Sequence, residues 1–434
     1  MFERLPPGQH GLGREEVERN QRRRLQGAMV SAVASHGYAK TTIRDLARVA
    51  GVSPNAFYEH YASKEECFLA THDATARRAI ERVSVAAAAA GDWRARVHAA
   101  LEAFVEAVLS EPDAAYLAIV ETHAAGPRAV EHQQRALESY ELAVRHCLKA
   151  APHGAAISDA TIKGIVGGIR SIVYHHLSEG HPLALGGLLE PIFEWIEGYH
   201  TNVAAGLPEP GPTRNGRARA STSPPAGRSA NGDSQTSHRE RIVRAVAAVT
   251  TEKGYGALTI PAITSAAGVS NQTFYEHFQN KNEAFLTCYD RASRRALGAT
   301  LASFQAAPSW PYAIRASLQT LLEFIAAHPE FARLAFFEVL AAGPAARKRA
   351  RARIEGFSAL LDPGFQQSEK PPPRIVSALV AGGAWGVIQF HVARGETVRL
   401  GELAPSLTYF ALTPFTGPNV AAEVALSEQP AAGA

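Results

Sequence analysis

The sequence predicts an all-α protein assembled from two copies of one helical unit. Apolar residues recur at helical spacing along the chain, and no alternating strand pattern competes with them. Residues 37–73 and 254–290 align without a gap at an offset of 217, with 17 of 37 positions identical. Between the copies, residues 205–237 are rich in Pro, Gly, Ser, Asn and Arg. Because such a stretch cannot bury enough apolar surface to offset its ordering entropy, we expect a flexible linker there.

The composition allows several ordinary globular cores. The chain has 434 residues, of which 46% are hydrophobic, and a formal net charge of +3. A charge this small does not indicate nucleic-acid binding by itself, so such evidence has to be local. No apolar run approaches the roughly 18 residues needed to cross a bilayer, and the N-terminus lacks an apolar signal core. We therefore expect a cytoplasmic protein with no membrane partner.

The chain carries none of the common catalytic or metal-binding patterns. Cys67, Cys147 and Cys288 form no CxxC pair, and the pair His175-His176 has no further ligand at metal spacing. We expect the cysteines to be buried on helix faces, with a redox pair as the alternative. There is no nucleophile–base set, paired-carboxylate motif, Walker loop or GxGxxG. The sequence thus predicts no enzyme activity, no metal and no cofactor.

The duplication extends well beyond the 37 aligned positions. Trp93 matches Trp310 and Glu121 matches Glu338 at the same offset of 217. After a small deletion the offset becomes 215, where Gly168 matches Gly383. The repeat therefore covers a whole unit of roughly 180 residues.

In the first copy, two short helices are predicted around a glycine turn. Thr42 caps the helix Ile43–Ala50, with an acid three positions later as in a capping box. Gly51 allows the tight turn, and Ser53 caps the helix Pro54–Tyr61, whose proline occupies the first position. A short helix, a glycine turn and a second capped helix form the helix-turn-helix shape that enters the major groove of DNA.

The second copy repeats this arrangement. Thr259 caps the short helix, Gly268 makes the turn, and Ser270 caps the helix Asn271–Phe278. Its exposed positions carry Asn, Gln and Thr, whereas the first copy has Asn55 nearly alone as a polar reader. We therefore expect the first copy to read sequence less stringently.

The residue types at these positions suit DNA. Asn and Gln pair with adenine, Thr and Ala contact the thymine methyl group, and a lysine at a helix N-terminus suits a phosphate. For the histidines, backbone contact or capping is an alternative to base reading. The expected DNA-contacting residues are Thr42, Ser53, Pro54, Asn55, Ala56, Tyr58, His60 and Lys64 in the first copy, and Thr259, Ser270, Asn271, Gln272, Thr273, Tyr275, His277 and Lys281 in the second.

The run T-[IV]-x-x-[IL]-x-x-x-A-G-V-S-x-x-x-[FL]-Y-x-[HY]-[FY]-x-x-K-x-x occurs twice, at 42–66 and 259–283. It resembles the signature of tetracycline-repressor (TetR) family regulators, and the resemblance covers nearly all of the chain outside the linker and the two ends. It implies, for each copy, a three-helix DNA-binding domain followed by a helical ligand-binding and dimerisation bundle.

The expected domains follow from the repeat and this resemblance. They are a first DNA-binding domain with an N-terminal arm at 1–74, a first effector domain at 75–204, the linker at 205–237, a second DNA-binding domain at 238–291, a second effector domain at 292–417 and a disordered tail at 418–434. The predicted effector helices are 92–110, 113–125, 128–150, 159–179 and 187–204, then 311–327, 330–342, 345–361, 373–393 and 402–412.

Apolar residues in these helices exceed what one packed face needs, so we expect an interior pocket for a small-molecule effector. Its candidate lining residues are the aromatic or polar groups of otherwise apolar helices, with core or interface packing as the alternative for each. They are Trp93, His98, Tyr116, His123, Arg170 and Tyr174 in the first copy, and Trp310, Phe324, Phe336, Trp385, Gln389 and His391 in the second. The second set is more aromatic, which favours a hydrophobic effector.

One chain with two DNA-binding domains, each called a head below, suggests a covalent pseudo-dimer. The linker of 33 residues has a coil span of roughly 30–35 Å, close to the 34–36 Å between half-sites one turn apart. We expect the helices near 159–204 and 373–412 to form the interface, and an effector to release a repressor from an imperfect palindrome in its operator. The alternatives are a homodimer of tandem chains, a binding protein in which one helix-turn-helix is unused, and a helical enzyme.

Overall fold

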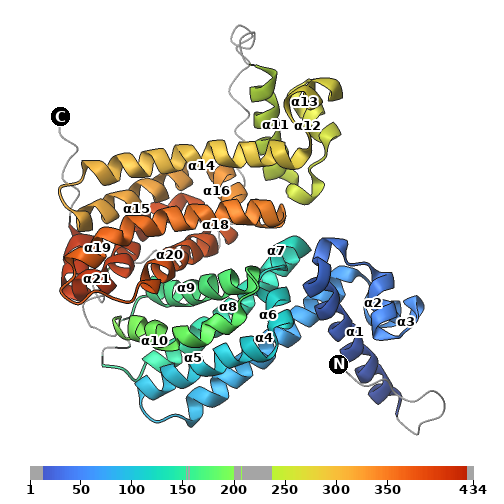
Figure 1. The fold of residues 1–434 in the computed structure, drawn as a ribbon, viewed down its shortest axis with the longest axis horizontal. Helices are drawn as coiled ribbons and strands as arrows, with labels where there is room; N and C mark the ends of the chain where they lie inside the picture. The colour runs from blue at the N-terminus through green and yellow to red at the C-terminus, as the bar shows by residue number, and fades with distance from the viewer. Residues whose placement is uncertain (1–12, 153, 155–156, 200–206, 208–236, 428–434) are drawn as a thin grey trace. The chain divides into compact units, whose positions relative to one another are not determined.

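The computed structural model describes residues 13–152, 154, 157–199, 207 and 237–427, and these contain helices and no strand (Figure 1). The predicted linker at 205–237 therefore lies outside the described residues, except for positions 207 and 237. The same holds for the first twelve residues of the N-terminal arm and for 428–434.

The helices follow the repeat. In the first copy they are α1 (Arg14–His36), α2 (Ile43–Ala50), α3 (Pro54–His60), α4 (Lys64–Ala89), α5 (Trp93–Ser110), α6 (Pro112–Ile119), α7 (Thr122–Ala125), α8 (Pro127–Leu148), α9 (Asp159–Ser178) and α10 (Leu189–Glu197). In the second they are α11 (His238–Lys253), α12 (Ile260–Ala267), α13 (Asn271–His277), α14 (Lys281–Ala306), α15 (Trp310–Ala327), α16 (Pro329–Arg333), α17 (Val339–Ala341), α18 (Pro344–Ser358), α19 (Asp362–Gln367), α20 (Ile375–Ala393) and α21 (Ala404–Leu426). Short 3₁₀ turns follow α1 and α11, namely η1 (Tyr38–Lys40) and η6 (Tyr255–Ala257).

The chain divides into two compact units whose boundary does not follow the repeat. One unit holds Met1–Leu207 together with Arg351–Phe390 and Leu407–Ala434. The other holds Pro208–Ala350 and His391–Ser406. Residues 351–390 and 407–434 of the second copy thus belong to the same compact unit as the first copy.

In the first unit, α4, α5, α8 and α9 lie side by side as a bundle (Figure 1). The core of the first DNA-binding domain is continuous with this bundle. Met29 of α1, Phe57 of α3 and Phe68 of α4 are fully buried in one cluster with Leu117 of α6. A single core therefore joins the helix-turn-helix to α6 of the effector region.

Helices α9 and α20, one from each copy, meet through glycines. A Cβ on Gly167 would lie 3.2 Å from the Cα of Gly386, and a Cβ on Gly168 would lie 2.5 Å from the carbonyl oxygen of Leu379. A Cβ on Gly383 would in turn lie 2.5 Å from the carbonyl oxygen of Gly164. Because the backbones are this close, only glycine fits at these positions.

A pseudo-two-fold axis relates the α9 side of this interface to the α20 side. At the repeat offset of 215, Gly168 and Leu379 correspond to Gly383 and Gly164, so the two closest backbone approaches are equivalent to each other. Trp195 and Phe410 are also equivalent positions, and their rings pack 5.9 Å apart. Reciprocal contacts of this kind define the isologous interface of a two-fold dimer. Here both halves belong to one chain.

The second unit repeats the arrangement of the first DNA-binding domain. Helix α11 packs on α12 and α14, and α14 runs along α15. Ile242, Phe274 and Phe285 are fully buried in it. The turn η9 (Thr397–Leu403) lies against α15.

The structure corrects three sequence predictions. The tail does not begin at Pro418: a break at Gly417 is followed by further helix to Leu426, where Ala421 and Val424 are buried. The statement that no apolar run approaches membrane length is wrong, because α20 is long and apolar enough; its glycine face packs against α9. The stretches 113–125 and 330–342 are not single helices, since the first breaks between α6 and α7 and the second contains a π-helix, Leu334–Glu338.

The three cysteines are buried, as the sequence predicts. Burial raises the pKa of Cys67 and of Cys288 to about 12, and it also raises the pKa of Cys147. Because the thiolate is the reactive form, none of the three is poised for redox chemistry in the folded chain.

Candidate nucleic-acid interface and effector cavity

Local capping sets the geometry of the first helix-turn-helix. The hydroxyl of Thr42 accepts from the backbone N–H of Asp45 at 3.2 Å, and Asp45 accepts in return from the backbone N–H of Thr42 at 3.3 Å. The Thr42 hydroxyl also donates to Asp45, which lowers the pKa of that carboxyl. Gly51 adopts φ 62° and ψ 40°, a left-handed conformation that directs the chain steeply into α3.

Helix α3 is anchored on one side and free on the other. Ser53 caps it by accepting from the N–H of Ala56 at 3.0 Å, and Phe57 is fully buried beneath it. Pro54, Asn55 and Tyr58 are exposed, and the Tyr58 side chain keeps 56% of its surface. These are the groups of α3 that a DNA groove can meet.

His60 does not share that exposed face. It is half-buried, and its Nε2 lies 2.8 Å from Oε1 of Gln21 on α1. Burial, followed by the charge of Arg22, lowers its pKa. This contact ties α3 to α1, and contact of His60 with DNA stays a prediction.

Helix α13 of the second copy carries the richer set of polar groups. Ser270 caps it through the N–H of Thr273 at 3.0 Å, and Thr259 caps α12 through the N–H of Ala262 at 3.3 Å. Gln272 is exposed, and Tyr275 keeps 58% of its surface. The polar positions predicted from the sequence therefore do lie on the surface of this helix.

Two of the second copy's residues are also held within the domain. The Oδ1 of Asn271 accepts from the Thr264 hydroxyl at 3.0 Å, which fixes the amide at the start of α13. His277 is half-buried, with its ring 6.4 Å from that of His238 on α11. The Asn271 amide is thus held by its own domain, and its contact with DNA stays a prediction. His277 resembles His60 in its position.

The lysines that open α4 and α14 point inward rather than toward solvent. Nζ of Lys64 donates to the carbonyl oxygens of Tyr38 and Thr41, both at 3.0 Å, and burial lowers its pKa. Nζ of Lys281 donates to the carbonyl of Leu258 at 2.7 Å. Each ammonium also lies over the tyrosine ring of its 3₁₀ turn. Their contact with DNA phosphates stays a prediction, and the structure gives them a role in holding η1 and η6.

Two arginines link the turn of each helix-turn-helix to the first helix of its domain. Arg24 of α1 donates to the carbonyls of Ala50 and Gly51, the latter at 2.9 Å. Its counterpart Arg241 donates to the carbonyl of Ala267 at 2.8 Å. These bonds satisfy the C-terminal carbonyls of α2 and α12 and fix the turn against the first helix. The acceptors lie 26 residues along the chain, so no local pattern reveals them.

A buried glutamate joins each effector region to its DNA-binding domain. Glu121 is 3% exposed, and its Oε2 accepts from the backbone N–H of Tyr38 at 2.8 Å. In the second copy, Oε2 of Glu338 accepts from the N–H of Tyr255 at 2.7 Å. The repeat aligns these two glutamates in the sequence, but only the fold shows that each accepts a hydrogen bond from the turn after α1 or after α11.

A largely apolar cavity of about 150 Å³ lies within the first bundle. Alanine, valine, leucine and isoleucine side chains of α4, α5, α6, α8, α9 and α10 form most of its wall, with Phe104 and Tyr140 as aromatic members. Arg170 of α9 contributes a cation to the same wall. An apolar cavity of this size holds a molecule with a single ring.

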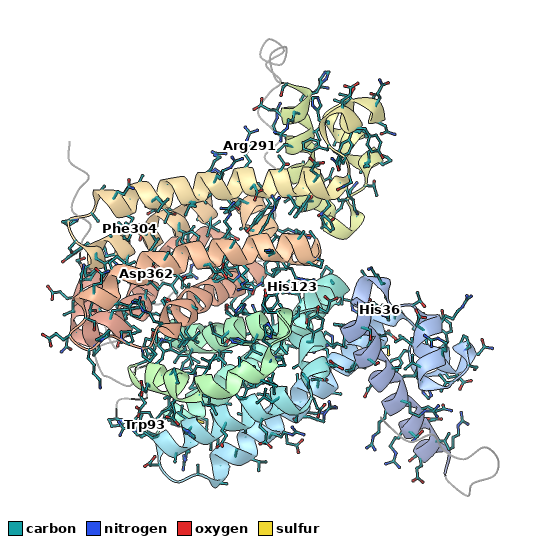
Figure 2. All side chains as sticks on the ribbon, in the orientation of Figure 1. His36, Trp93, His123, Arg291, Phe304 and Asp362 are labelled. Atoms are coloured by element: carbon teal, nitrogen blue, oxygen red, sulfur yellow. The ribbon has the colours of Figure 1, made fainter. Side chains whose placement is uncertain are left out.

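Of the first copy's candidate ligand residues, Arg170 lines this cavity. Trp93 is buried at the opposite end of the bundle from His123 (Figure 2), and His98 pairs with Glu190 on the surface at 3.0 Å. Tyr116 and Tyr174 are half-buried on α6 and α9. Sequence reasoning missed the small apolar lining, because alanines and valines facing a cavity have the same spacing as those facing a core.

The second copy's candidates occupy other positions. Trp310 and Phe336 are buried in the core. Phe324 stacks on His328 with ring centroids 4.3 Å apart. Nδ1 of His391 lies 2.8 Å from Oε2 of Glu396. Trp385 and Gln389 lie on α20, and Gln389 is bonded to Arg170. None of the six lines the cavity of the first bundle, so their contact with an effector stays a prediction.

The family profile described as bacterial regulatory proteins, tetR family, matches the chain at two places, residues 30–71 and 242–288. These ranges are the two helix-turn-helix segments just described. The chain belongs to the TetR family. It is a DNA-binding transcriptional regulator with two TetR units in tandem, and members of this family are not enzymes.

Several solved structures resemble this TetR regulator over part of its length. The fatty acid degradation regulator FadR of Bacillus halodurans matches with 15% identity and a TM-score of 0.38, over 41% of this chain and 94% of that one. FadR of Bacillus subtilis, solved with stearoyl-CoA, has 16% identity and a TM-score of 0.37, over 40% and 96%. A TetR-like regulator of Rhodococcus sp. RHA1 has 21% identity and a TM-score of 0.34, over 42% and 96%. No curated protein matches the chain.

Proposed function

We propose that this regulator acts as a covalent pseudo-dimer, in which one chain supplies both reading heads for an imperfect palindrome. The observation that carries the proposal is the reciprocal α9–α20 contact, where Gly168 against Leu379 is matched by Gly383 against Gly164. A two-fold dimer interface inside one chain removes the need for a second chain. It also frees the two heads to differ in sequence.

The two recognition helices support an operator with unlike halves. Helix α3 exposes Asn55 and Tyr58, while α13 exposes Gln272 and Tyr275 beside the oriented amide of Asn271. Asn and Gln discriminate adenine by paired hydrogen bonds, so the second half-site should carry the stronger sequence preference.

The cavity of the first bundle supports control by a small apolar effector. Its wall is mostly aliphatic, which rewards removal of apolar surface from water. We infer that the apo regulator represses from its operator in the cytoplasm and that effector binding lowers DNA affinity.

The test is selection of binding sites from random duplex DNA with the purified chain, followed by sequencing. We expect an enriched bipartite site with two different halves. Replacing Gln272 and Tyr275 by alanine should remove the preference in one half, and replacing Asn55 and Tyr58 should weaken the other. A perfectly symmetric site would show that two chains each lend the same head, and absence of enrichment at moderate salt would contradict sequence-specific binding.

A further inference from the structure

Arg170 is an unusual group in the wall of an apolar cavity. Its Nη2 donates to the amide oxygen of Gln389 at 2.8 Å, and none of the described carboxylates forms an ion pair with it. Burial lowers its pKa, since the cation loses hydration there. A guanidinium that borders a cavity and is bonded to a neutral amide favours an anionic group placed beside it.

Other arginines of the same cavity are already neutralised. Arg78 donates to Glu111 at 2.7 Å, and Arg82 lies 3.6 Å from the other oxygen of that carboxylate. All three side chains line the cavity, but only Arg170 offers its charge without a carboxylate. The uncompensated charge therefore lies at one defined place in the wall.

We propose that the effector cavity binds a compact apolar monocarboxylate whose acid group pairs with Arg170, and that this contact controls the first DNA-binding head alone. The inference rests on the proposed function of the cavity and adds the chemical class of its ligand. The aliphatic wall takes the apolar body. The guanidinium takes the carboxylate with two parallel hydrogen bonds, which draws Arg170 away from Gln389.

Gln389 connects Arg170 to the helix beside the first head. While Oε1 of Gln389 accepts from Arg170, its Nε2 lies 3.3 Å from Nε2 of His123 on α7. An amide nitrogen can only donate, so the histidine nitrogen is the acceptor. Gln389 and His123 are 3% and 4% exposed, so water does not readily replace either bond.

Helix α7 begins immediately after the glutamate that holds the first head. Glu121 precedes α7, and its carboxylate binds the N–H of Tyr38 at 2.8 Å. A change at Arg170 thus reaches the turn after α1 through Gln389, His123 and the short α7. Each step is a hydrogen-bond contact or a direct chain connection.

The second copy keeps the bond from the glutamate to the turn after its first helix, but it lacks the residues that correspond to Arg170 and His123. Glu338 holds Tyr255 as Glu121 holds Tyr38. At the repeat offsets, however, Leu340 stands where His123 is, and Trp385 stands where Arg170 is. Leucine has no polar atom to accept a hydrogen bond, and an indole carries no charge to pair with a carboxylate, so these residues cannot form the same chain of contacts. The second head should therefore be insensitive to the ligand.

Calorimetric titration tests the ligand class and needs no DNA. The probes are two pairs that differ in charge, namely benzoate with benzyl alcohol and hexanoate with 1-hexanol. We expect at least one acid to bind about tenfold more tightly than its alcohol, a difference that R170M abolishes. R128M, which removes a surface arginine paired with Glu65, is the control and should leave the ratio unchanged. Equal affinities of acid and alcohol in both pairs for the unmodified chain would overturn the proposal, whether or not R170M folds.

Hydrogen exchange tests the route to the first head. In the unmodified chain, the better acid should accelerate exchange in peptides that contain Tyr38 by at least threefold, and peptides that contain Tyr255 are the internal control. H123L replaces His123 by leucine, the residue type that the second copy has at the equivalent position, Leu340. It should retain acid binding but lose the response at Tyr38. Equal responses at both tyrosines, or an unchanged response in H123L, would contradict control through His123.

These outcomes are separate from the operator test. Acid binding with exchange at Tyr38 would support the inference even if site selection returned a symmetric operator. An operator with unlike halves combined with no preference for acids would retain the proposed function and remove this inference.

Discussion

The two copies of the repeat share the residues that shape the DNA-binding turn, but they differ at the start of the recognition helix and beside the cavity. Gly51 and Gly268 share the left-handed turn, and Glu121 and Glu338 share the bond to the turn after the first helix. The first residues of α3 and α13 differ while the exposed Tyr58 and Tyr275 are the same, and the counterparts of Arg170 and His123 also differ. The two copies thus share the residues that hold the helix-turn-helix in shape, and they differ at residues proposed to contact DNA or the effector.

The largest expected effect concerns the pseudo-two-fold interface. G168A and G383A each place a methyl group 2.5 Å from a backbone carbonyl oxygen of the opposing helix. Each should lower the free energy of unfolding of the first unit by about 3 kcal/mol, because neither backbone can yield easily. Urea unfolding followed by circular dichroism measures this, and a clear difference between the two variants would show that the interface is not reciprocal.

The buried glutamates give the next test of equivalence. E121L leaves the N–H of Tyr38 without that acceptor, and E338L does the same to Tyr255. Each should cost about 1–3 kcal/mol, the usual penalty for a buried donor left unpaired. Amide exchange at the two tyrosines reports each head separately. Slow exchange at Tyr38 in E121L would show that Glu121 is not what holds that turn.

Lys64 and Lys281 should separate stability from DNA contact. Because Lys64 donates to two carbonyls and Lys281 to one, K64M should destabilise its DNA-binding domain by about 1–2 kcal/mol and K281M by less. If the ammonium groups stay inward on DNA, the dependence of binding on salt concentration should keep its slope in both variants. A slope lower by about one in either variant would instead restore that lysine as a phosphate contact.

The smallest effect concerns the pairing of α4 with α8. Burial would raise the pKa of Asp73, but bonds from His72 and His132 more than offset this and hold it at about 2. A depressed pKa means that Asp73 contributes stability above its usual value of 3.8, and the contribution disappears as the pH falls toward 2. D73N should therefore lower the Tm at pH 5 and have a much smaller effect at pH 2.

The counterpart pair in the second copy is Asp290 with Arg349. D290N is the matched variant, and it should also destabilise its own unit, because it removes the charge that Arg349 meets. G298A serves as a general control, since a Cβ there meets nothing within 4 Å. That change should leave the fold intact and raise stability by about 0.5–1 kcal/mol, because alanine favours a helix interior.

The sequence by itself determined the caps and turns, which depend on neighbours in the chain. The caps Thr42, Ser53 and Ser270 and the turn at Gly51 were predicted, because capping bonds span three residues and a left-handed turn needs glycine. The fixed offset between the copies likewise required no coordinates. Fold class and family follow from these local and repeated patterns.

Only the tertiary structure decided the rest. The acceptors of Lys64 and Arg24 lie 23 to 27 residues away, and Arg170 meets Gln389 across 219 residues. The cavity wall consists of aliphatic side chains that no pattern separates from a core, and the helix after Gly417 is buried by packing alone. Contacts between distant segments depend on how the helices pack, and the spacing of residues along one helix does not specify its neighbours.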